Sequence, residues 1–207
     1  MILKPRTTCR ICNSTQLSTI MSLGQQHIAA YTPRDSDPNP SLDKFPLELI
    51  RCTEPDCGLI QLRHSTPSDI LYERYFYRSG INKTMTENLK EIAIQAISKV
   101  ELHDNDIVLD IGCNDGTLLK NYQGKNLRSV GIDPAKNMAE FSKECGADII
   151  VDYFNSKSFT NHYNNEKAKI ITSISMFYDL EDPNQFVSDI VNILAKDGVW
   201  VIELKYL

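Results

Sequence analysis

A short apolar run that leads directly into a glycine turn constrains the fold of this chain more than any other feature. Residues 107–109 read Ile-Val-Leu, and residues 110–116 read Asp-Ile-Gly-Cys-Asn-Asp-Gly before a helical pattern resumes near residue 118. In folds of alternating strands and helices, a ligand binds at such a turn between the first strand and the first helix. Glycine lets the backbone approach a ligand closely, and the N-terminus of a helix favours negative charge. The sequence therefore predicts a ligand-binding turn at residues 110–116.

The pattern after residue 105 alternates between predicted strands and predicted helices. Four more apolar runs follow the first, at residues 129–132, 149–151, 169–174 and 198–204, and helices are predicted at residues 134–145 and from residue 182 onward. Continuous apolar strands separated by helices indicate a parallel sheet that is covered on both faces. We therefore expect residues 105–207 to form an α/β domain of the Rossmann-like kind.

A helical connection is expected ahead of this domain, over residues 67–104. Thr66 is a predicted N-cap and Pro67 is the first residue of a short helix, whereas residues 75–80 break the helical pattern. Thr84 and Glu87 then have the spacing of a capping box, which predicts the start of a second helix.

The spacing of the glycines argues against a dinucleotide cofactor. A Gly-x-Gly-x-x-Gly fingerprint counted from Gly112 would need glycine where the chain has Asn114 and Thr117. Asp110 also places a carboxylate beside the turn, which disfavours a pyrophosphate and suits a cationic ligand without phosphates. An NAD-dependent enzyme is therefore a disfavoured alternative, and an ordinary strand-to-helix turn with incidental glycines is another.

A second acidic residue ends the next predicted strand, about one βαβ unit further on. The carboxylate of Asp133 is placed to accept hydrogen bonds from both ribose hydroxyls of an adenosyl group. This pair of landmarks resembles class I S-adenosylmethionine (SAM)-dependent methyltransferases. The resemblance implies further contacts around the adenine after the third strand and near the sulfonium after the fourth. Within the turn, the side chain of Cys113 is expected to pack rather than to react. The expected cofactor-binding residues are Asp110, Gly112, Cys113, Asn114, Gly116, Asp133, Pro134, Asp152, Tyr153, Phe154, Ser175 and Met176.

Four of the six cysteines fall in the first 57 residues, where they form two pairs. Cys9 and Cys12 are separated by two residues, and Cys52 and Cys57 are separated by four. Two such pairs commonly hold a tetrahedral zinc ion. Residues 1–66 are rich in turns and short of apolar runs, so this segment needs a metal staple to fold. We therefore predict a zinc-binding module over residues 1–66, with a closed, structural site of four thiolates.

The four cysteines are also compatible with roles that need no zinc. They could be free and buried, or the first pair could be a redox-active Cys-x-x-Cys, although it does not lie at the strand-to-helix junction expected of a thioredoxin-like motif. His27 or His64 is a further alternative as one of the four metal ligands. Residues 32–40, which include three prolines, are expected to form an exposed loop.

The whole chain resembles the N-terminal half of the sugar C-methyltransferases, enzymes that act on nucleotide-linked deoxy-keto-sugars. The resemblance rests on three features in the same order: the four cysteines, a Tyr-x-Tyr-x-Ser-Gly element at residues 75–80, and the turn at residues 110–116. Two departures are visible. The second cysteine pair is wider than the two intervening residues usual in the family, and Ser175 and Asp179 stand where sugar methyltransferases carry asparagine and histidine.

This resemblance implies C-methylation through an enolate. A base removes the proton α to a keto group, and the enolate attacks the SAM methyl group in line, so positioning and removal of water do most of the work. The family's proposed active-site tyrosine, glutamate and histidine lie beyond residue 207, so the catalytic base is not expected in this chain. The sheet is accordingly expected to be a class I methyltransferase sheet truncated after its fifth strand. The expected substrate contacts are Tyr75, Tyr77, Ser175 and Asp179, although packing explains the two tyrosines equally well.

Composition limits the partners of the protein. The net charge of −5 argues against a general nucleic-acid or anionic-membrane surface. No apolar run is long enough for a secretory signal or a membrane helix. We therefore expect a cytoplasmic protein with a small nucleotide-sugar substrate, and the sequence leaves its oligomeric state open. The alternatives are O- or N-methylation of another small molecule, and a non-catalytic fragment that binds SAM and zinc.

Overall fold

The computed structural model describes residues 3–27 and 44–205. The chain forms two compact units. The first, here called the N-terminal unit, comprises Met1–Leu71 and Glu181–Asn184; the second, the parallel-sheet unit, comprises Tyr72–Leu180 and Gln185–Leu207. The loop predicted at residues 32–40 lies outside the described residues. Within the described ranges, no helix has both the length and the apolar character needed to cross a bilayer.

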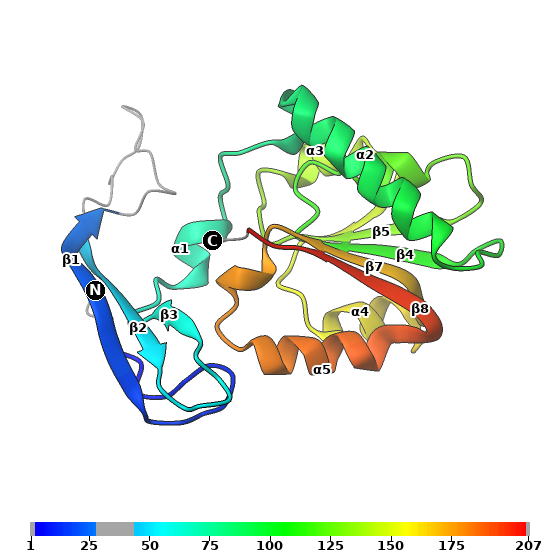
Figure 1. Ribbon diagram of the computed structural model, residues 1–207. Coiled ribbons are helices and arrows are strands. Elements are labelled where there is room, and N and C mark those ends of the chain that lie inside the picture. Colours follow the sequence, from blue (N-terminus) through cyan, green and yellow to red (C-terminus); the bar gives the residue numbers. More distant parts are fainter. Residues whose placement is uncertain (1–2, 28–43, 206–207) are drawn as a thin grey trace, which may run out of the picture. The chain divides into compact units, whose positions relative to one another are not determined.

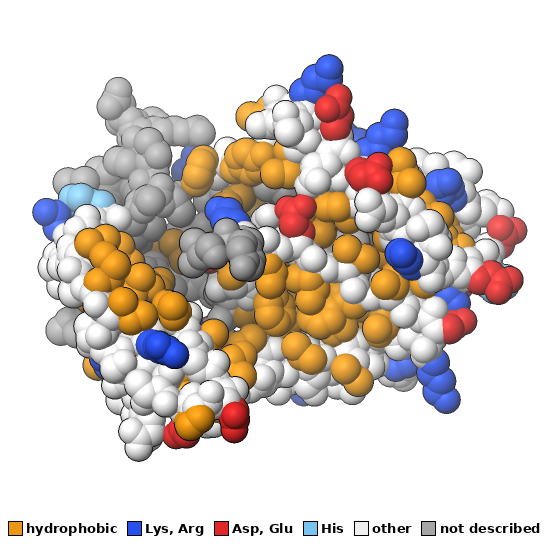
Figure 2. All heavy atoms as spheres, viewed as in Figure 1, with side chains coloured by type: hydrophobic (Ala, Val, Ile, Leu, Met, Phe, Trp, Pro, Cys, Tyr) orange, Lys and Arg blue, Asp and Glu red, His pale blue; other side chains and the backbone are white. Residues whose placement is uncertain are grey.

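The N-terminal unit is built on a small antiparallel sheet. Its strands are β1 (Leu17–His27), β2 (Lys44–Cys52) and β3 (Ile60–Leu62), in the order β1-β2-β3. The side chains of β1 are almost all exposed, and hydrophobic side chains gather on the visible face of this strand in Figure 2. Among the described residues of this unit, the buried apolar side chains are Cys9, Phe45, Ile50 and Cys52.

The segment Glu181–Asn184 completes the N-terminal unit through ionic contacts. The Glu181 carboxylate accepts hydrogen bonds from Arg6 at 2.7 Å and from Arg10 at 2.9 Å. Burial alone would raise the pKa of Glu181, but hydrogen bonds from Ser65, Arg10 and Arg6 outweigh it and lower that pKa to about 2.

The parallel-sheet unit contains a five-stranded sheet, as the apolar runs predict. Its order is β6-β5-β4-β7-β8, and every neighbouring pair is parallel. The predicted fold class, an α/β parallel sheet preceded by a small module, is confirmed. The strands are β4 (Ile107–Ile111), β5 (Arg128–Ile132), β6 (Asp148–Ile150), β7 (Ala168–Ile174) and β8 (Leu194–Glu203).

Helices cover both faces of this sheet. Figure 1 shows α2 (Lys83–Ser98) and α3 (Ala139–Lys143) on one face, and α4 (Ser156–Tyr163) and α5 (Pro183–Ile193) on the other. Side chains alternate along β4, so the strand contributes to two cores. Ile107, Leu109 and Ile111 pack with residues of α4 and α5, whereas Val108 packs with residues of α2. Both faces of the sheet are therefore shielded from water, which explains why the apolar run in β4 is continuous.

The predicted capping box at the start of the second helix is wrong. The helix α2 begins at Lys83, and its N-cap is Asn82, whose side chain accepts a hydrogen bond from the backbone N–H of Met85. Asn82 is an equally good capping residue and lies in the extended conformation that an N-cap requires. Glu87 instead lies 3.7 Å from the ammonium of Lys83, as an exposed ion pair.

Three other predicted elements differ in extent. The first helix, α1 (Ser68–Tyr72), begins one residue after the predicted Pro67. The helix after the glycine turn is a single turn of 3₁₀ helix, Leu119–Tyr122, because the Asn121 side chain bonds back to the carbonyls of Thr117 and Leu118 and competes with helix propagation. The helix predicted at residues 134–145 is reduced to α3, and β8 begins at Leu194, directly after α5.

Candidate functional site

The glycine turn connects the end of β4 to the helical turn after it. The backbone of Gly112 (φ +74°), Asn114 (φ +51°) and Gly116 (φ +75°) is left-handed, a conformation that glycine and asparagine tolerate best. A Cβ on Gly116 would lie only 2.7 Å from the Sγ of Cys145, so this position has no room for any side chain. The glycines are therefore required by the path of the turn as well as by access to a ligand.

Asp110 is the last polar residue of β4 and is almost fully buried. Its Oδ1 accepts a hydrogen bond of 2.5 Å from the hydroxyl of Thr172 on β7. Burial disfavours the charged form and raises the pKa of Asp110 from 3.8 to about 7; the nearby Asp133 adds to the rise, and the Thr172 hydroxyl opposes it.

Asp133 is held at the end of β5 by two backbone N–H groups. The amide of Asn114 donates to its Oδ2 and the amide of Ala135 donates to its Oδ1, both at 2.8 Å. Burial raises the pKa of Asp133, and these two donors partly offset that rise. Each carboxylate oxygen keeps a second lone pair, so both can still accept from a ligand hydroxyl.

The two carboxylates share one further property. No cation contributes to the environment of Asp110 or of Asp133 within the described part of the chain, although Asp110 is buried and Asp133 is half-buried. Buried carboxylates are normally paired with a cation or kept protonated. The turn therefore offers two acceptors for a ligand that carries positive charge and vicinal hydroxyls. SAM, with its sulfonium, ammonium and ribose groups, fits these acceptors.

The Tyr-x-Tyr-x-Ser-Gly element crosses the glycine turn; we call residues 75–80 the strap. The side chain of Asn114 accepts from the amide of Ser79 and donates to the carbonyl of Tyr77. The amide of Gly80 donates to Asp115 Oδ2 at 2.8 Å. These contacts bring the strap against the predicted cofactor turn.

A second pair of contacts fastens the start of the strap to the segment after β5. The amide of Tyr75 donates to Asn137 Oδ1, and the Asn137 side chain donates back to the carbonyl of Tyr75. The guanidinium of Arg78 stacks 3.6 Å from the ring centroid of Phe141. The sequence did not predict the anchoring roles of Asp115, Asn137 and Phe141, because each side chain contacts a segment 35 to 63 residues away along the chain. The polar pair Asn114-Asp115 inside the turn was the available signal.

Aromatic side chains gather beside the strap. The rings of Tyr72 and Tyr75 are 6.2 Å apart, and Asp179 forms a side-chain hydrogen bond with Tyr72. Burial raises the pKa of Tyr75, and burial likewise raises the pKa of Asp179. Of the expected substrate contacts, Tyr75 and Asp179 therefore lie in one cluster with Tyr72. This cluster lies near the carboxyl end of β7, because Asp179 follows that strand.

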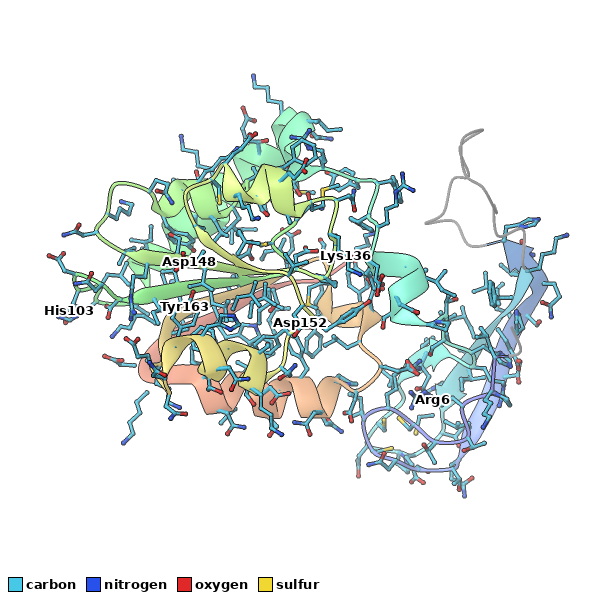
Figure 3. All side chains as sticks on the ribbon, turned by 180° about the vertical axis from the view of Figure 1, so that it is seen from behind. Arg6, His103, Lys136, Asp148, Asp152 and Tyr163 are labelled. Carbon is cyan, nitrogen blue, oxygen red and sulfur yellow. The ribbon has the colours of Figure 1, made fainter. Side chains whose placement is uncertain are left out.

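The residues expected around the adenine follow β6. In Figure 3, Asp152 lies toward the carboxyl end of the strands together with Lys136, whereas His103 lies toward the opposite end. Asp152 is exposed, and the ring of Phe154 packs edge-on against Phe186 at 5.1 Å. The ring of Phe154 is therefore partly buried by packing against the core.

Cys113 lies in the turn but is buried at 3% exposure. Burial raises the pKa of its thiol well above the ordinary value, and Asp110 and Asp133 raise it further. The side chain therefore remains protonated and packs under the turn, where a Cβ on Gly131 would come within 2.6 Å of its sulfur.

The four N-terminal cysteines form one cluster. The Sγ atoms of Cys9, Cys12, Cys52 and Cys57 all lie within 4.8 Å of one another, and no histidine belongs to any such group among the described residues. The Cys9–Cys57 and Cys12–Cys52 sulfur pairs are each 3.6 Å apart. Zinc–sulfur bonds of about 2.3 Å in a tetrahedron imply sulfur–sulfur distances of about 3.8 Å, so the cluster fits a zinc ion.

The surroundings of Cys9 favour a thiolate. Burial would raise its pKa, but backbone N–H groups of Cys12 and Ile11 outweigh that effect, and the pKa of Cys9 falls to about 7. At Cys52 a backbone hydrogen bond lowers the pKa, but burial and the neighbouring thiols outweigh it and raise the pKa to about 12, and the pKa of Cys57 is also raised. Zinc binds thiolates, so a bound ion would favour deprotonation of these thiols as well. The four predicted ligands therefore lie together in one cluster, and neither His27 nor His64 belongs to it.

Comparison with protein families matches both parts of the chain. Residues 9–72 match a family described as "Putative zinc binding domain", and residues 76–205 match one described as "Methyltransferase domain".

A curated relative, the C-methyltransferase NovU of Streptomyces niveus, is 26% identical over 210 residues. The match covers 100% of this chain and 49% of that protein, so the chain spans about half the length of this relative.

Two solved structures are among those to which this chain is similar. The cyclopropane synthase MmaA2 from Mycobacterium tuberculosis is 21% identical, with a TM-score of 0.47 over 61% of this chain and 47% of that one. The mycolic acid cyclopropane synthase CmaA1, complexed with SAH and CTAB, is 21% identical, with a TM-score of 0.46 over 66% and 49%.

The methyltransferase model covers well over half of the chain, and it coincides with the parallel sheet, the glycine turn and the carboxylates of Asp110 and Asp133. The chain therefore belongs to the SAM-dependent methyltransferase-domain family, and a zinc-binding domain precedes its methyltransferase domain.

Proposed function

We propose that this chain provides the zinc-binding and SAM-binding parts of a C-methyltransferase whose substrate is a nucleotide-linked keto-deoxysugar. The observation that carries the cofactor assignment is a pair of carboxylates, the buried Asp110 and the half-buried Asp133, which flank the turn and have no protein cation beside them in the described part of the chain. The match to NovU over the full length of the chain supports C-methylation. The division into residues 1–66, 67–104 and 105–207 is part of the same proposal.

The cofactor contacts follow from the geometry of the turn. Asp133 accepts from the ribose hydroxyls, and Asp110 lies where a positive charge offsets its burial. Gly112 and Gly116 allow the backbone to approach. The remaining proposed contacts are Cys113 and Ser175, each through its backbone, and Asn114, Pro134, Asp152, Tyr153, Phe154 and Met176.

The substrate is proposed to lie beside the cluster at the carboxyl end of β7. Tyr75 and Tyr77 on the strap exclude water, and Ser175 and Asp179 offer polar contacts to a sugar. The SAM sulfonium supplies an electrophilic methyl group, so this chain's part in the chemistry is to orient the enolate carbon and keep the site dry. No residue of this chain is assigned as the base that removes the α proton. We place the protein in the cytoplasm, where zinc-binding thiols stay reduced.

A panel of nucleotide-linked keto-sugars, incubated with SAM and the full-length protein, tests the proposed reaction. Mass spectrometry should detect transfer of one methyl group to a carbon atom. In D₂O without SAM, the same substrate should exchange its α proton for deuterium, because enolate formation precedes transfer. Methylation of a hydroxyl or amine without α exchange would support the O- or N-methyltransferase alternative. Binding of SAM with no transfer to any sugar would support the non-catalytic alternative.

A further inference from the structure

One residue at the end of β7 has an unusual backbone. Ser175 has a φ of +54°, and all other non-glycine residues with positive φ in the described part of the chain are asparagines. A left-handed backbone is unfavourable for a residue with a Cβ, and it persists only where neighbouring contacts impose it. Contacts with another residue must therefore stabilise the left-handed backbone of Ser175.

Glu203, the last residue of β8, makes these contacts. Its backbone carbonyl accepts from the amide of Ser175 at 3.0 Å. Its carboxylate Oε1 accepts from the Ser175 hydroxyl at 3.2 Å, and its Oε2 accepts from the side-chain amide of Asn88 on α2 at 2.7 Å. One glutamate thus joins the ends of β7 and β8 to the helix α2, at the edge of the sheet where Figure 1 shows β7 and β8 side by side.

The conformation of Ser175 sets the position of the next residue. A Cβ placed on Gly112 would lie 3.5 Å from the Cγ of Met176 and 3.7 Å from its Cβ. The chain then enters the short 3₁₀ helix Phe177–Asp179. Through Met176, the corner after β7, residues 175–179, therefore lies directly beside the glycine turn.

We propose that Glu203 is a positioning residue: it holds Ser175 in the left-handed conformation, and thereby keeps the corner at residues 175–179 against the turn that binds SAM. This inference rests on the proposed SAM site. Glu203 acts through Ser175 and Met176 and makes no contact with the cofactor itself. Asn88 restrains the carboxylate by donating a hydrogen bond to its other oxygen.

Substitution at both ends of the contact tests this role, because glycine adopts positive φ without strain. Glu203→Ala should weaken SAM binding, measured by calorimetry, by about tenfold, the scale of a left-handed penalty for a residue with a Cβ. Ser175→Gly added to Glu203→Ala should restore the affinity to within about threefold of the wild type. Ser175→Ala, which removes the hydroxyl but keeps the Cβ, should give no such rescue. A purely structural or ligand-contacting role for Glu203 predicts no difference between the glycine and alanine double variants, and that result would overturn the proposal.

Two further measurements separate this proposal from the SAM site itself. Hydrogen exchange at the amides of Asp179 and Leu180, which bond to Met176 and Phe177, should accelerate in Glu203→Ala and slow again in the double variant with Ser175→Gly. This readout needs no ligand, so it decides the positioning role even if the wild type does not bind SAM. Unchanged exchange in Glu203→Ala would contradict the role. Should Glu203→Ala not fold, Glu203→Gln keeps the acceptor for Ser175 and should bind SAM within about threefold of the wild type.

Discussion

The two units of this chain reach stability by different means. The N-terminal unit buries only two large apolar side chains among its described residues, Phe45 and Ile50. It also brings four cysteine sulfurs together in one cluster, the zinc site described above. The parallel-sheet unit buries two apolar clusters, one on each face of its sheet. One unit therefore depends on its metal, and the other depends on its core.

The largest predicted effect is loss of zinc from the N-terminal unit. Cys9→Ser should reduce the zinc content from one ion per chain to nearly none, because a structural zinc ion contributes about 10 kcal/mol or more to such a site. The fluorescence of Trp200, the one tryptophan of the chain, reports on the parallel-sheet unit alone. Its thermal transition should move by less than about 2 °C.

Cys145→Ala is the matched control, since Cys145 lies in the parallel-sheet unit and outside the cluster. It should retain one zinc ion per chain. A full complement of zinc in Cys9→Ser, or a loss of the Trp200 transition on chelation, would break the contrast between the units.

The second effect concerns pH and the parallel-sheet unit. The pKa of Asp110 is about 7 in the folded state against 3.8 when unperturbed, so between these values the folded chain binds the extra proton. Stability from this group is therefore present at low pH and lost as pH rises through about 7. Asp110→Asn should remove that dependence and stabilise the unit at pH 8 by up to about 4 kcal/mol, measured by urea unfolding of the Trp200 signal.

The same substitution should weaken SAM binding, because it removes the charge that faces a cationic ligand. Asp104→Asn, at an exposed position, is the control and should change neither quantity. An Asp110→Asn protein that is less stable than the wild type at pH 8 would show that the carboxylate has a cationic partner.

The third effect compares two glycines with the same backbone. Gly116 and Gly124 both have a φ of +75°, but a Cβ on Gly124 meets no atom within 4 Å. Gly124→Ala should therefore lower the free energy of unfolding by about 1 kcal/mol, the left-handed penalty alone. Gly116→Ala should lower it by about 3 kcal/mol, because the added methyl group also collides with Cys145.

Adding Cys145→Ala to Gly116→Ala should recover part of the difference. Equal losses from the two glycine substitutions would mean that the turn tolerates a side chain, which the close approach of Cys145 forbids.

The smallest effect concerns the start of α2. Asn82→Ala should lower the free energy of unfolding of the parallel-sheet unit by about 1 kcal/mol, because the amide of Met85 loses its acceptor. Thr84→Ala should have an effect below about 0.5 kcal/mol. A larger loss of unfolding free energy for Thr84→Ala than for Asn82→Ala would instead support the capping box expected from the sequence.

The features that the sequence predicted correctly are local or periodic. The order of the five strands along the chain follows from apolar runs, and the metal cluster follows from cysteine spacing. Asn82 was not predicted as the N-cap because Thr84, two residues later, is also a good capping residue with a glutamate at the capping-box spacing. The length of the helix after the turn was missed because the Asn121 side chain competes for backbone carbonyls.

The candidate site was predictable only in part for a similar reason. The turn and Asp133 follow from their place at the ends of strands. The anchoring of the strap by Asn114 and Asn137, and the contact of Glu203 with Ser175, join segments 28 to 62 residues apart. No periodicity records such contacts, because each needs one side chain and one backbone group to meet in the folded state.

A calorimetric titration of SAM tests the assignment of the cofactor site most directly, with Asp133→Ala and Asp104→Ala as the paired variants. The wild type and Asp104→Ala should bind SAM with equal affinity. Asp133→Ala should bind at least about 100-fold more weakly, since it loses two hydrogen bonds from ribose to a charged acceptor. NAD should not bind. Binding of NAD but not SAM, or an unchanged SAM affinity in Asp133→Ala, would contradict the assignment.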